Sequence, residues 1–316
     1  MDNNEIKNLF DKTKITKPLI LDGACGCLLQ EKNPEFYDDD IWMTKINRGK
    51  PEEVGRVAKL YLDSGANIIT TNTFRTNTIS LNTYNTKNTT DNKAKLNSEE
   101  EVKTAFDILH KLRKDNQHKP FLIAGSNPPS EDCYIKKQVN SYEAIKDNHI
   151  DHINLLYKYG ADIILNETMS FSNEVDICQK YCFQNNINYI VSLYIDNDLK
   201  LNSGEKLIHM LKKIDELKPL AISVNCISVK IFKDLIKEGE SIIKSLKCGF
   251  GYYLNCGDPK NTETNYLENN FNPFVTPKDY VEVIKEYGYL KPVMVGSCCM
   301  STPDHTQEIY NYYNSK

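Results

Sequence analysis

The chain has 316 residues, a formal net charge of −4 at neutral pH and 40% hydrophobic residues. A net charge so close to zero gives no general attraction to nucleic acid or to anionic membranes, and no apolar run approaches the roughly 18 residues of a membrane-spanning helix. Residues 1–17 are too polar for a secretory signal. We therefore expect a cytoplasmic protein whose partners include neither nucleic acid nor membrane.

Short β-rich runs alternate with longer amphipathic stretches along the chain. We predict strands at 18–21, 67–71, 121–125, 162–165, 189–193, 221–224, 249–254 and 292–295. We predict helices at 51–64, 98–113, 141–159, 174–185, 204–216, 231–245 and 277–287. Proline at a first helical position supports the starts at Pro51 and Pro277 and indicates another at Pro303, and Ser98 with Glu101 has the spacing of a capping box.

Strand–helix alternation requires a parallel sheet, and eight repeats in about 300 residues favour a closed barrel over an open doubly wound sheet. The sequence also lacks a Gly-x-Gly-x-x-Gly motif after the first predicted strand. We therefore predict an α/β fold, a (β/α)₈ TIM barrel, as a single domain over residues 1–316 with its core at 18–310. Residues 77–97, rich in Asn, Thr and Lys, are predicted to be a polar loop insertion on the rim, either a lid or a solvated excursion.

Polar and metal-binding residue types follow several predicted strands at their carboxyl ends, where barrel enzymes place their sites. These residues are Asp22, Gly23, Thr71, Asn72, Thr73, Glu167, Asn225, Cys226, Cys298 and Cys299. Chance would distribute such residues over both rims of the barrel. Their concentration on one rim predicts a functional site there.

Ten cysteines are scattered along the chain without the short regular spacings of a disulfide-stapled secreted domain, so we interpret them as reduced thiols. Cys226, Cys298 and Cys299 bring three sulfurs together if the runs before them are neighbouring strands. Three sulfurs make a zinc site with one position open for a substrate thiol, which the metal holds as thiolate. Cys178 and Cys182, four apart on a helical pattern, are interpreted as core residues rather than a metal pair, because free cysteine is usually buried.

Five ordered segments carry a family resemblance: residues 21–23 (LDG), 64–74 (SGANIITTNTF), 160–168 (GADIILNET), 224–226 (VNC) and 296–299 (GSCC). In these segments the chain resembles the zinc-dependent homocysteine S-methyltransferases, and the match runs from about residue 19 to residue 310. The resemblance implies a (β/α)₈ barrel in which Cys226, Cys298 and Cys299 bind one Zn²⁺ per chain. Homocysteine sulfur would take the fourth position and receive a methyl group to give methionine.

The resemblance also implies roles for the other strand-end residues. Glu167 matches a glutamate that contacts the substrate amino group, and the turn at Asp22 and Gly23 matches one that offers backbone N–H groups to the substrate carboxylate. The remaining matches to the substrate pocket are Thr71, Asn72, Thr73 and Asn225. For Asn72 and Asn225, hydrogen bonding that supports the site is the alternative role. No catalytic residue beyond the metal-activated substrate thiol is required, because zinc removes the proton.

Residues 41–42 and 47–64 resemble the stand-alone members that use S-methylmethionine or S-adenosylmethionine, so we favour a methyl-sulfonium donor. Trp42 is a candidate for the donor pocket through cation–π attraction, or else a plug at the barrel mouth. The chain departs from the family at Cys25 and Cys27, which add two thiols near the proposed site. Two alternatives stay open: a homocysteine-activating subunit of a cobalamin-dependent or betaine-dependent system, and a non-catalytic zinc–thiolate barrel closed by Cys25 or Cys27.

Overall fold

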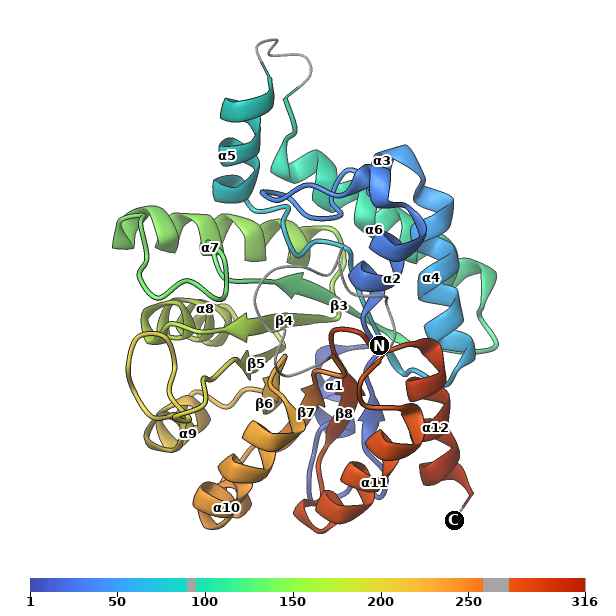
Figure 1. Cartoon of the computed structure of the whole chain (residues 1–316), viewed down its shortest axis with the longest axis vertical. Coiled ribbons are helices and arrows are strands. Elements are labelled where there is room, and N and C mark those ends of the chain that lie inside the picture. Colours follow the sequence, from blue (N-terminus) through green and yellow to red (C-terminus); the bar gives the residue numbers. More distant parts are fainter. Residues whose placement is uncertain (90–94, 258–272, 316) are drawn as a thin grey trace.

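Eight parallel strands form one closed sheet in the computed structural model of the chain, with helices around it (Figure 1). The structure describes residues 1–89, 95–257 and 273–315. The hydrogen-bonded order is β1-β8-β7-β6-β5-β4-β3-β2, and a parallel bridge between Leu21 and Ile68 joins the first strand to the second. The sheet therefore closes on itself, and the predicted (β/α)₈ barrel is confirmed.

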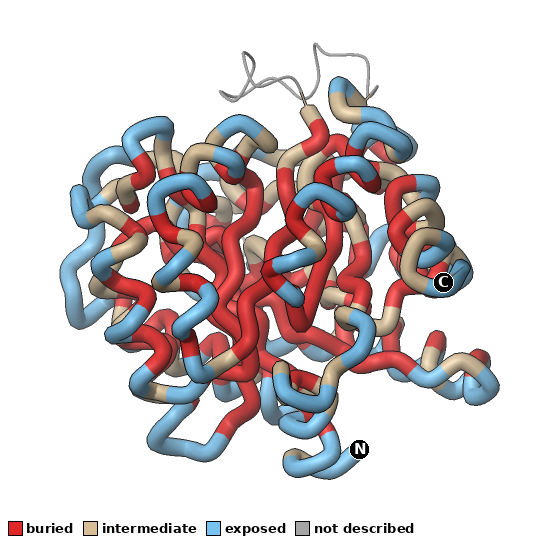
Figure 2. Tube along the Cα trace, turned by 90° about the horizontal axis from the view of Figure 1, so that it is seen from below, coloured by how far each residue is buried: buried red, intermediate tan, exposed pale blue. Residues whose placement is uncertain are grey.

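The strands occur where the alternation predicted them. They are β1 (Leu19–Ile20), β2 (Ile68–Thr70), β3 (Leu122–Asn127), β4 (Ile163–Met169), β5 (Tyr189–Leu193), β6 (Ala221–Asn225), β7 (Gly249–Leu254) and β8 (Met294–Ser297). The largest difference is at the end of β4, which continues past Leu165 to Met169. Most strand residues are buried, as the near-continuous apolar runs of a parallel sheet require (Figure 2).

The helices surround the barrel (Figure 1). They are α1 (Asn3–Leu9), α2 (Cys25–Lys32), α3 (Ile46–Gly49), α4 (Pro51–Asp63), α5 (Thr78–Asn88), α6 (Ser98–Asp115), α7 (Tyr142–Lys158), α8 (Ser172–Gln184), α9 (Leu207–Glu216), α10 (Val229–Ser245), α11 (Pro277–Tyr287) and α12 (Pro303–Asn314), with short 3₁₀ turns at Pro34–Phe36 and Gly288–Leu290. Every predicted helix is present. No helix among the described residues has the length and apolar character needed to cross a membrane.

The prediction of a polar loop at 77–97 is wrong over most of its length, because helix α5 occupies Thr78–Asn88. Asn and Thr are weak helix formers, so composition hid this helix. Its ends are fixed by side chains: Asn77 accepts a hydrogen bond from the N–H of Ser80 (3.0 Å), and Asn85 exchanges two bonds with the backbone of Leu96 (both 2.9 Å). Residues 90–94 of this stretch lie outside the described residues.

The start of α6 also differs from its prediction. Asn97, not Ser98, caps the helix and accepts from the N–H of Glu100 (3.3 Å). The side chain of Glu101 is fully buried and pairs with Arg48 Nε at 2.7 Å, which joins α6 to α3. Glu101 therefore makes a tertiary contact with Arg48 and does not complete a capping box with Ser98.

Helix α1 closes the amino-terminal end of the barrel. Ile6 and Phe10 are buried in one cluster with residues from inside the sheet, among them Leu122 and Ile163 near the starts of β3 and β4. The Lys12 ammonium reaches the carbonyl of Leu246, just before β7. With one end sealed, the carboxyl ends of the strands are left to form a site.

Candidate metal and substrate site

Three cysteines meet at the carboxyl ends of β6 and β8. Cys226 follows β6 directly, Cys298 and Cys299 follow β8, and their three sulfurs lie within 4.8 Å of one another. The sulfurs meet although the two strands are not neighbours, because β7 lies between them. Two backbone bonds to the end of β7 hold both cysteine segments: the Cys226 N–H donates to Tyr253 (3.3 Å) and the Cys298 N–H to Leu254 (2.8 Å).

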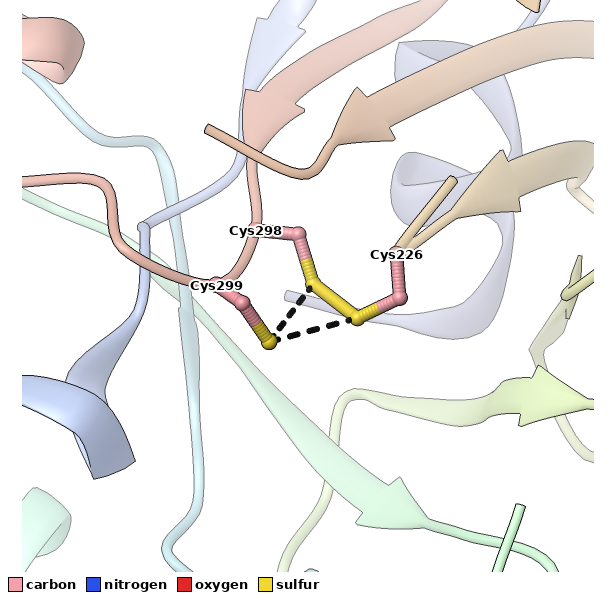
Figure 3. Close-up of side chains that lie close together, drawn as sticks. All are labelled: Cys226, Cys298 and Cys299. Carbon is pink, nitrogen blue, oxygen red and sulfur yellow. Dashed lines mark hydrogen bonds between the residues drawn. A yellow bond between two sulfur atoms is a disulfide. The ribbon is translucent and has the colours of Figure 1, made fainter. Parts of the chain in front are cut away.

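Cys226 and Cys298 are joined by a disulfide, and Cys299 Sγ lies 3.6 Å from Cys226 Sγ and 4.0 Å from Cys298 Sγ (Figure 3). The expectation of reduced thiols is therefore wrong for this pair; the other eight cysteines, all within the described residues, form no disulfide. Tetrahedral zinc with Zn–S bonds of about 2.3 Å sets its sulfurs roughly 3.8 Å apart. The spacings from Cys299 match that geometry, so the three residues fit a metal once the disulfide is reduced.

A cavity of about 430 Å³ lies beside the three sulfurs. Most of the residues that the sequence placed on this rim line the cavity. They are Asp22, Gly23, Trp42, Thr71, Asn72, Glu167, Cys226, Cys298 and Cys299. A glycine is required at position 23, because a Cβ there would lie 2.7 Å from Ser301 Oγ and from a ring carbon of Tyr61. The backbone of this turn can thus pack closely against the segment that carries Cys298 and Cys299.

Two carboxyl groups face this cavity. Asp22 accepts hydrogen bonds from the N–H (2.8 Å) and the hydroxyl (2.9 Å) of Thr70, while burial raises its pKa to about 7. Glu167 accepts from the hydroxyls of Ser126 and Tyr253, the latter at 3.4 Å, and burial raises its pKa to about 7 as well. The charge of Glu167 contributes to the raised pKa of Asp22. Two acidic groups in one pocket favour a ligand that carries a positive charge.

Local backbone geometry explains how Glu167 reaches the cavity. The pairing of β4 with β5 shifts between Asn166 and Met169, and Thr168 within this bulge adopts a left-handed conformation with φ 57°. A bulge re-aims the side chains beside it. The resulting turn directs the Glu167 carboxyl toward Ser126 and Tyr253.

Thr73 and Asn225 do not line the cavity, although the sequence placed them in it. The Thr73 hydroxyl donates to the Ser126 carbonyl (2.8 Å). Asn225 Oδ1 accepts from the N–H of Thr168 (3.0 Å) and the hydroxyl of Ser192 (2.7 Å). Both side chains are fully buried and brace the strand ends that carry the site.

Asn72 and Trp42 line the cavity and are also hydrogen-bonded to α3 and α2. Asn72 Nδ2 donates to Asn47 Oδ1 (2.9 Å), and Asn47 Nδ2 donates back to the Asn72 carbonyl (2.9 Å). Trp42 Nε1 donates to Gln30 Oε1 (2.9 Å), and its ring packs edge-on against Phe74 with centroids 5.7 Å apart. These contacts fix the aromatic wall of the cavity.

The turn at Asp22 is hydrogen-bonded to the barrel through its backbone. The Asp22 N–H donates to the Ile68 carbonyl (3.0 Å). Two residues further on, the Ala24 N–H donates to Ser301 Oγ (3.1 Å). The Asp22 N–H is therefore bonded within the barrel, and the role of the turn at Asp22 and Gly23 toward a substrate carboxylate stays a prediction. The Asp22 side chain, not this amide, belongs to the pocket.

Sequence reasoning missed the two donors to Glu167. Ser126 lies at the end of β3 and Tyr253 at the end of β7, so the strand-end rule that selected the other residues would also have selected these two. It also missed the outer cavity wall, in which only Phe74 belongs to one of the five quoted segments. That wall includes Tyr37, Asp38, Asp39, Phe74, Arg75, Asp132 and Tyr134.

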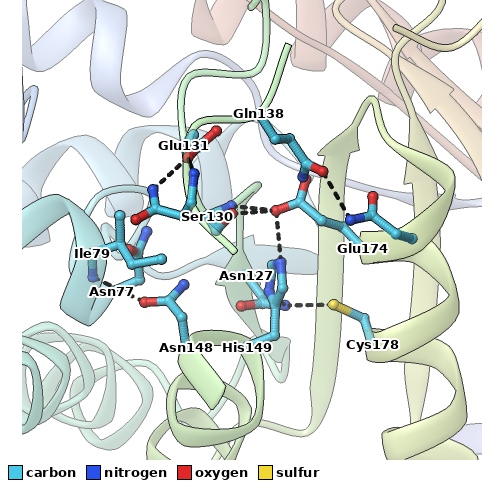
Figure 4. Close-up of polar contacts among 12 residues, drawn as sticks. Asn77, Ile79, Asn127, Ser130, Glu131, Gln138, Asn148, His149, Glu174 and Cys178 are labelled. Carbon is cyan, nitrogen blue, oxygen red and sulfur yellow. Dashed lines mark hydrogen bonds and ion pairs between the residues drawn. The ribbon is translucent and has the colours of Figure 1, made fainter. Parts of the chain in front are cut away.

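A buried polar network supports the chain beyond Ser126 (Figure 4). Glu174 Oε1 accepts from the N–H (2.8 Å) and the hydroxyl (2.5 Å) of Ser130 and pairs with His149 Nε2 at 3.0 Å. Asn127 Nδ2 donates to Asn166 Oδ1 (2.8 Å), which links β3 to β4. These bonds fix the two strand ends from which Ser126 and Glu167 project.

Comparison with known proteins agrees with this geometry. The family model described as homocysteine S-methyltransferase matches residues 19–313. Homocysteine S-methyltransferase 2 of Zea mays is 24% identical over 314 residues, covering 94% of this chain and 90% of the maize protein.

Among solved structures, the fold resembles the homocysteine methyltransferase MmuM from Escherichia coli. Its metallated form has a TM-score of 0.76 at 18% identity, covering 95% of this chain and 98% of that one. Its oxidised form has a TM-score of 0.71 at 17% identity, covering 93% and 96%. At such identities the structural likeness shows the fold, whereas the family model spans nearly the whole sequence. This chain therefore belongs to the homocysteine S-methyltransferase family of enzymes.

Proposed function

We propose that this enzyme transfers a methyl group from a sulfonium donor to the thiolate of L-homocysteine, giving methionine. In this proposal Cys226, Cys298 and Cys299 hold one zinc ion per chain. The observation that carries it is the meeting of three sulfurs within 4.8 Å at the wall of a cavity that also presents the Glu167 carboxyl. A thiol and an ammonium, the two reactive ends of homocysteine, would each find a partner there.

Zinc, when bound, supplies the acidity that keeps a substrate thiol in its thiolate form near neutral pH. The residues of the chain bind the substrate and orient it for the reaction. Glu167 receives the substrate ammonium, and the hydroxyls of Ser126 and Tyr253 hold the carboxylate in place. The substrate sulfur attacks the methyl carbon in line, and as the new C–S bond forms, the old one breaks and leaves its electron pair on the donor sulfur.

The cationic donor is supported by the outer part of the cavity. Aromatic rings attract cations through their faces, and carboxylates do so by charge. The wall combines both kinds of residue: Tyr37, Trp42, Phe74 and Tyr134 with Asp38, Asp39 and Asp132. Asp132 pairs with Arg75 of the same wall (3.3 Å) and Asp38 with Lys45 (3.2 Å), so the rings and Asp39 contribute most of the attraction for a cation. Together with the resemblance at residues 41–42 and 47–64, this lining favours S-methylmethionine or S-adenosylmethionine as donor.

The test measures zinc content of reduced protein by elemental analysis and methionine formation from homocysteine with S-methylmethionine, S-adenosylmethionine and betaine in parallel. We expect about one zinc per chain and turnover with a sulfonium. Turnover with betaine alone would contradict the donor assignment, and absence of zinc from reduced protein would contradict the metal assignment.

The variant that tests the metal ligands is Cys298→Ser. We expect it to lose zinc and more than about 100-fold in kcat/KM, since even outer partners of metal ligands contribute 10- to 100-fold. Cys248→Ser is the matched control, because Cys248 directly precedes β7 at the opposite end of the barrel. Full activity in Cys298→Ser would rule out the proposed metal site.

A further inference from the structure

An ion pair of Arg75 and Asp132 lies in the outer wall of the cavity. Arg75 follows β2 and Asp132 follows β3, and both residues line the cavity. Arg75 Nη2 lies 3.3 Å from Asp132 Oδ2. A wall that only has to attract a cation does not need the guanidinium, so the pair indicates a ligand with charges of both signs.

The Arg75 guanidinium is held in place by its surroundings. Its side chain is 12% exposed, Nη1 donates to the Glu131 carbonyl (2.9 Å), and the guanidinium carbon lies 5.4 Å from the centre of the Phe74 ring. A guanidinium has five N–H donors, and hydrogen bonds to described residues occupy two of them, through Nη1 and Nη2. The group is therefore preorganised and still has donors for an anionic ligand.

We propose that Arg75 and Asp132 bind the α-amino acid head group of the methyl donor, with the carboxylate on Arg75 and the ammonium on Asp132. This inference rests on the proposed function, because it concerns the sulfonium donor of that reaction. The pair would select an amino acid sulfonium, such as S-methylmethionine or S-adenosylmethionine, over a cation without such a head group.

The charges of the pair match a zwitterion. The Asp132 side chain is 56% exposed, and an exposed ion pair contributes little to stability, so this one can open for a ligand at small cost. The pair is neutral as a whole and complements a head group that carries two opposite charges. The third charge of the donor, on its sulfur, is left for the aromatic rings.

The aromatic rings lie at a suitable distance from Arg75. Phe74 contacts both the Arg75 guanidinium (5.4 Å) and the Trp42 ring (5.7 Å). In S-methylmethionine four bonds separate the sulfonium from the carboxylate carbon, roughly 5 Å when the chain is extended. A sulfonium beside these rings and a carboxylate on Arg75 can thus belong to one molecule. Betaine spans about half of that distance and has no ammonium for Asp132.

Homocysteine has the same kind of head group, but its ammonium is assigned to Glu167. That residue lies within β4 and is hydrogen-bonded to Ser126 in β3. Arg75 and Asp132 instead lie in the loops beyond β2 and β3. The head groups of the two substrates are therefore assigned to different parts of the cavity.

Donor analogues that each lack one charge test the assignment. They are aminopropyl-dimethylsulfonium, which lacks the carboxylate, and dimethylsulfonio-butyrate, which lacks the ammonium. Initial rates at saturating homocysteine give kcat/KM for S-methylmethionine and for each analogue, using reduced, zinc-loaded protein. In wild type we expect kcat/KM to be about 10-fold or more lower for each analogue, since hydrogen bonds to charged groups are strong.

Each variant of the pair should lose one preference only. Arg75→Gln should lower kcat/KM for S-methylmethionine about 10-fold or more and should no longer distinguish it from the analogue without a carboxylate. Asp132→Asn should keep that distinction and lose the one that depends on the ammonium. Arg75→Lys, which keeps the charge without the planar fork, should retain part of the carboxylate preference. Arg56→Gln, in a surface pair with Glu53 on α4, is the matched control and should alter nothing.

Zinc content and KM for homocysteine should stay at wild-type values in all of these variants, which would show an intact site. Equal kcat/KM for all three donors in wild type would overturn the inference and leave the proposed function intact. A loss in Arg75→Gln that affects every donor equally would reduce the pair to a structural contact. A rise only in KM for homocysteine would place the other substrate there. Absence of turnover with every sulfonium would overturn the proposed function and this inference together.

Discussion

Buried charge at individual residues determines which ligand the cavity can hold. Asp22 and Glu167 both have a pKa raised to about 7, mainly by burial. Each carboxyl also has hydrogen-bond donors within the barrel, from Thr70 and from Ser126 with Tyr253. An ammonium that binds near Glu167 compensates for the cost of its buried negative charge, so binding and ionisation of this side chain are coupled.

The Glu167→Gln variant tests this coupling. We expect KM for homocysteine to rise about 10- to 100-fold, since a hydrogen bond to a charged group contributes about 1.5–3 kcal/mol, while zinc content stays unchanged. In wild type, kcat/KM should increase as pH rises through about 7, because Glu167 then loses its proton and attracts the ammonium. The increase should be smaller in the variant, measured by initial rates at a series of pH values.

Glu143→Gln provides the control, because Glu143 is exposed on α7 and pairs with Lys146 at the surface (3.3 Å). It should leave KM and its pH dependence unaltered. An unchanged KM in Glu167→Gln would mean that the substrate amino group binds elsewhere.

Sequence alone identified the three proposed metal ligands and Glu167, because residue type and position at a strand end are both visible in it. It misplaced Asn225 and Thr73, since the direction of a side chain at a strand end depends on the local turn. Cys226 adopts a left-handed conformation with φ 53°, which sets the direction of the chain just after Asn225. Such a turn at a non-glycine residue has no sequence pattern to reveal it.

At the scale of elements, the two ends of the barrel have separate tasks. Helix α1 seals the amino-terminal end with Ile6 and Phe10, while loops after the strands build the cavity at the other end. In barrel enzymes, residues at the amino-terminal face contribute stability and those at the carboxyl face contribute chemistry. Changes under α1 should therefore affect folding without affecting catalysis.

Phe10→Ala tests this separation. Phe10 is 3% exposed, and removing a buried phenyl ring typically costs about 3–5 kcal/mol. We expect the free energy of unfolding, from denaturant titration, to fall by about 3 kcal/mol while KM for homocysteine is unchanged in native conditions.

Phe183→Ala is the comparison, since Phe183 is 46% exposed on α8 and should change stability by less than about 1 kcal/mol. If Phe10→Ala raised KM as strongly as Glu167→Gln, the two ends of the barrel would not be independent.

The elements that sequence failed to show are short or poor in apolar residues. Helices α1 and α2 have seven and eight residues, too few for a clear 3.6-residue pattern. Helix α5 is rich in Asn and Thr and owes its bounds to Asn77 and Asn85. The strands were visible because burial on both faces of a parallel sheet imposes continuous apolar runs. The longer helices were visible because their apolar residues recur with the 3.6-residue helical period.

Over the whole molecule, the fold gathers thiols that are far apart in the sequence. Six of the ten cysteines line one cavity: Cys25, Cys27, Cys133, Cys226, Cys298 and Cys299. The closed order of the strands brings β1, β6 and β8 to the same rim, and the segments that follow them, including the start of α2, carry five of these residues. A metal and a disulfide compete for the same sulfurs at this rim, so the state of the site depends on the redox state of the protein.

This competition predicts a link between thiol count and metal uptake. Protein isolated without reductant and unfolded in denaturant should show eight reactive thiols, because Cys226 and Cys298 are joined, and after reduction it should show all ten. Zinc uptake should occur only after reduction, since a disulfide sulfur has no thiolate to offer. In Cys226→Ser the count should be nine before and after reduction. Ten thiols in unreduced wild-type protein, or zinc uptake by protein with eight, would show that the disulfide does not control access to the metal.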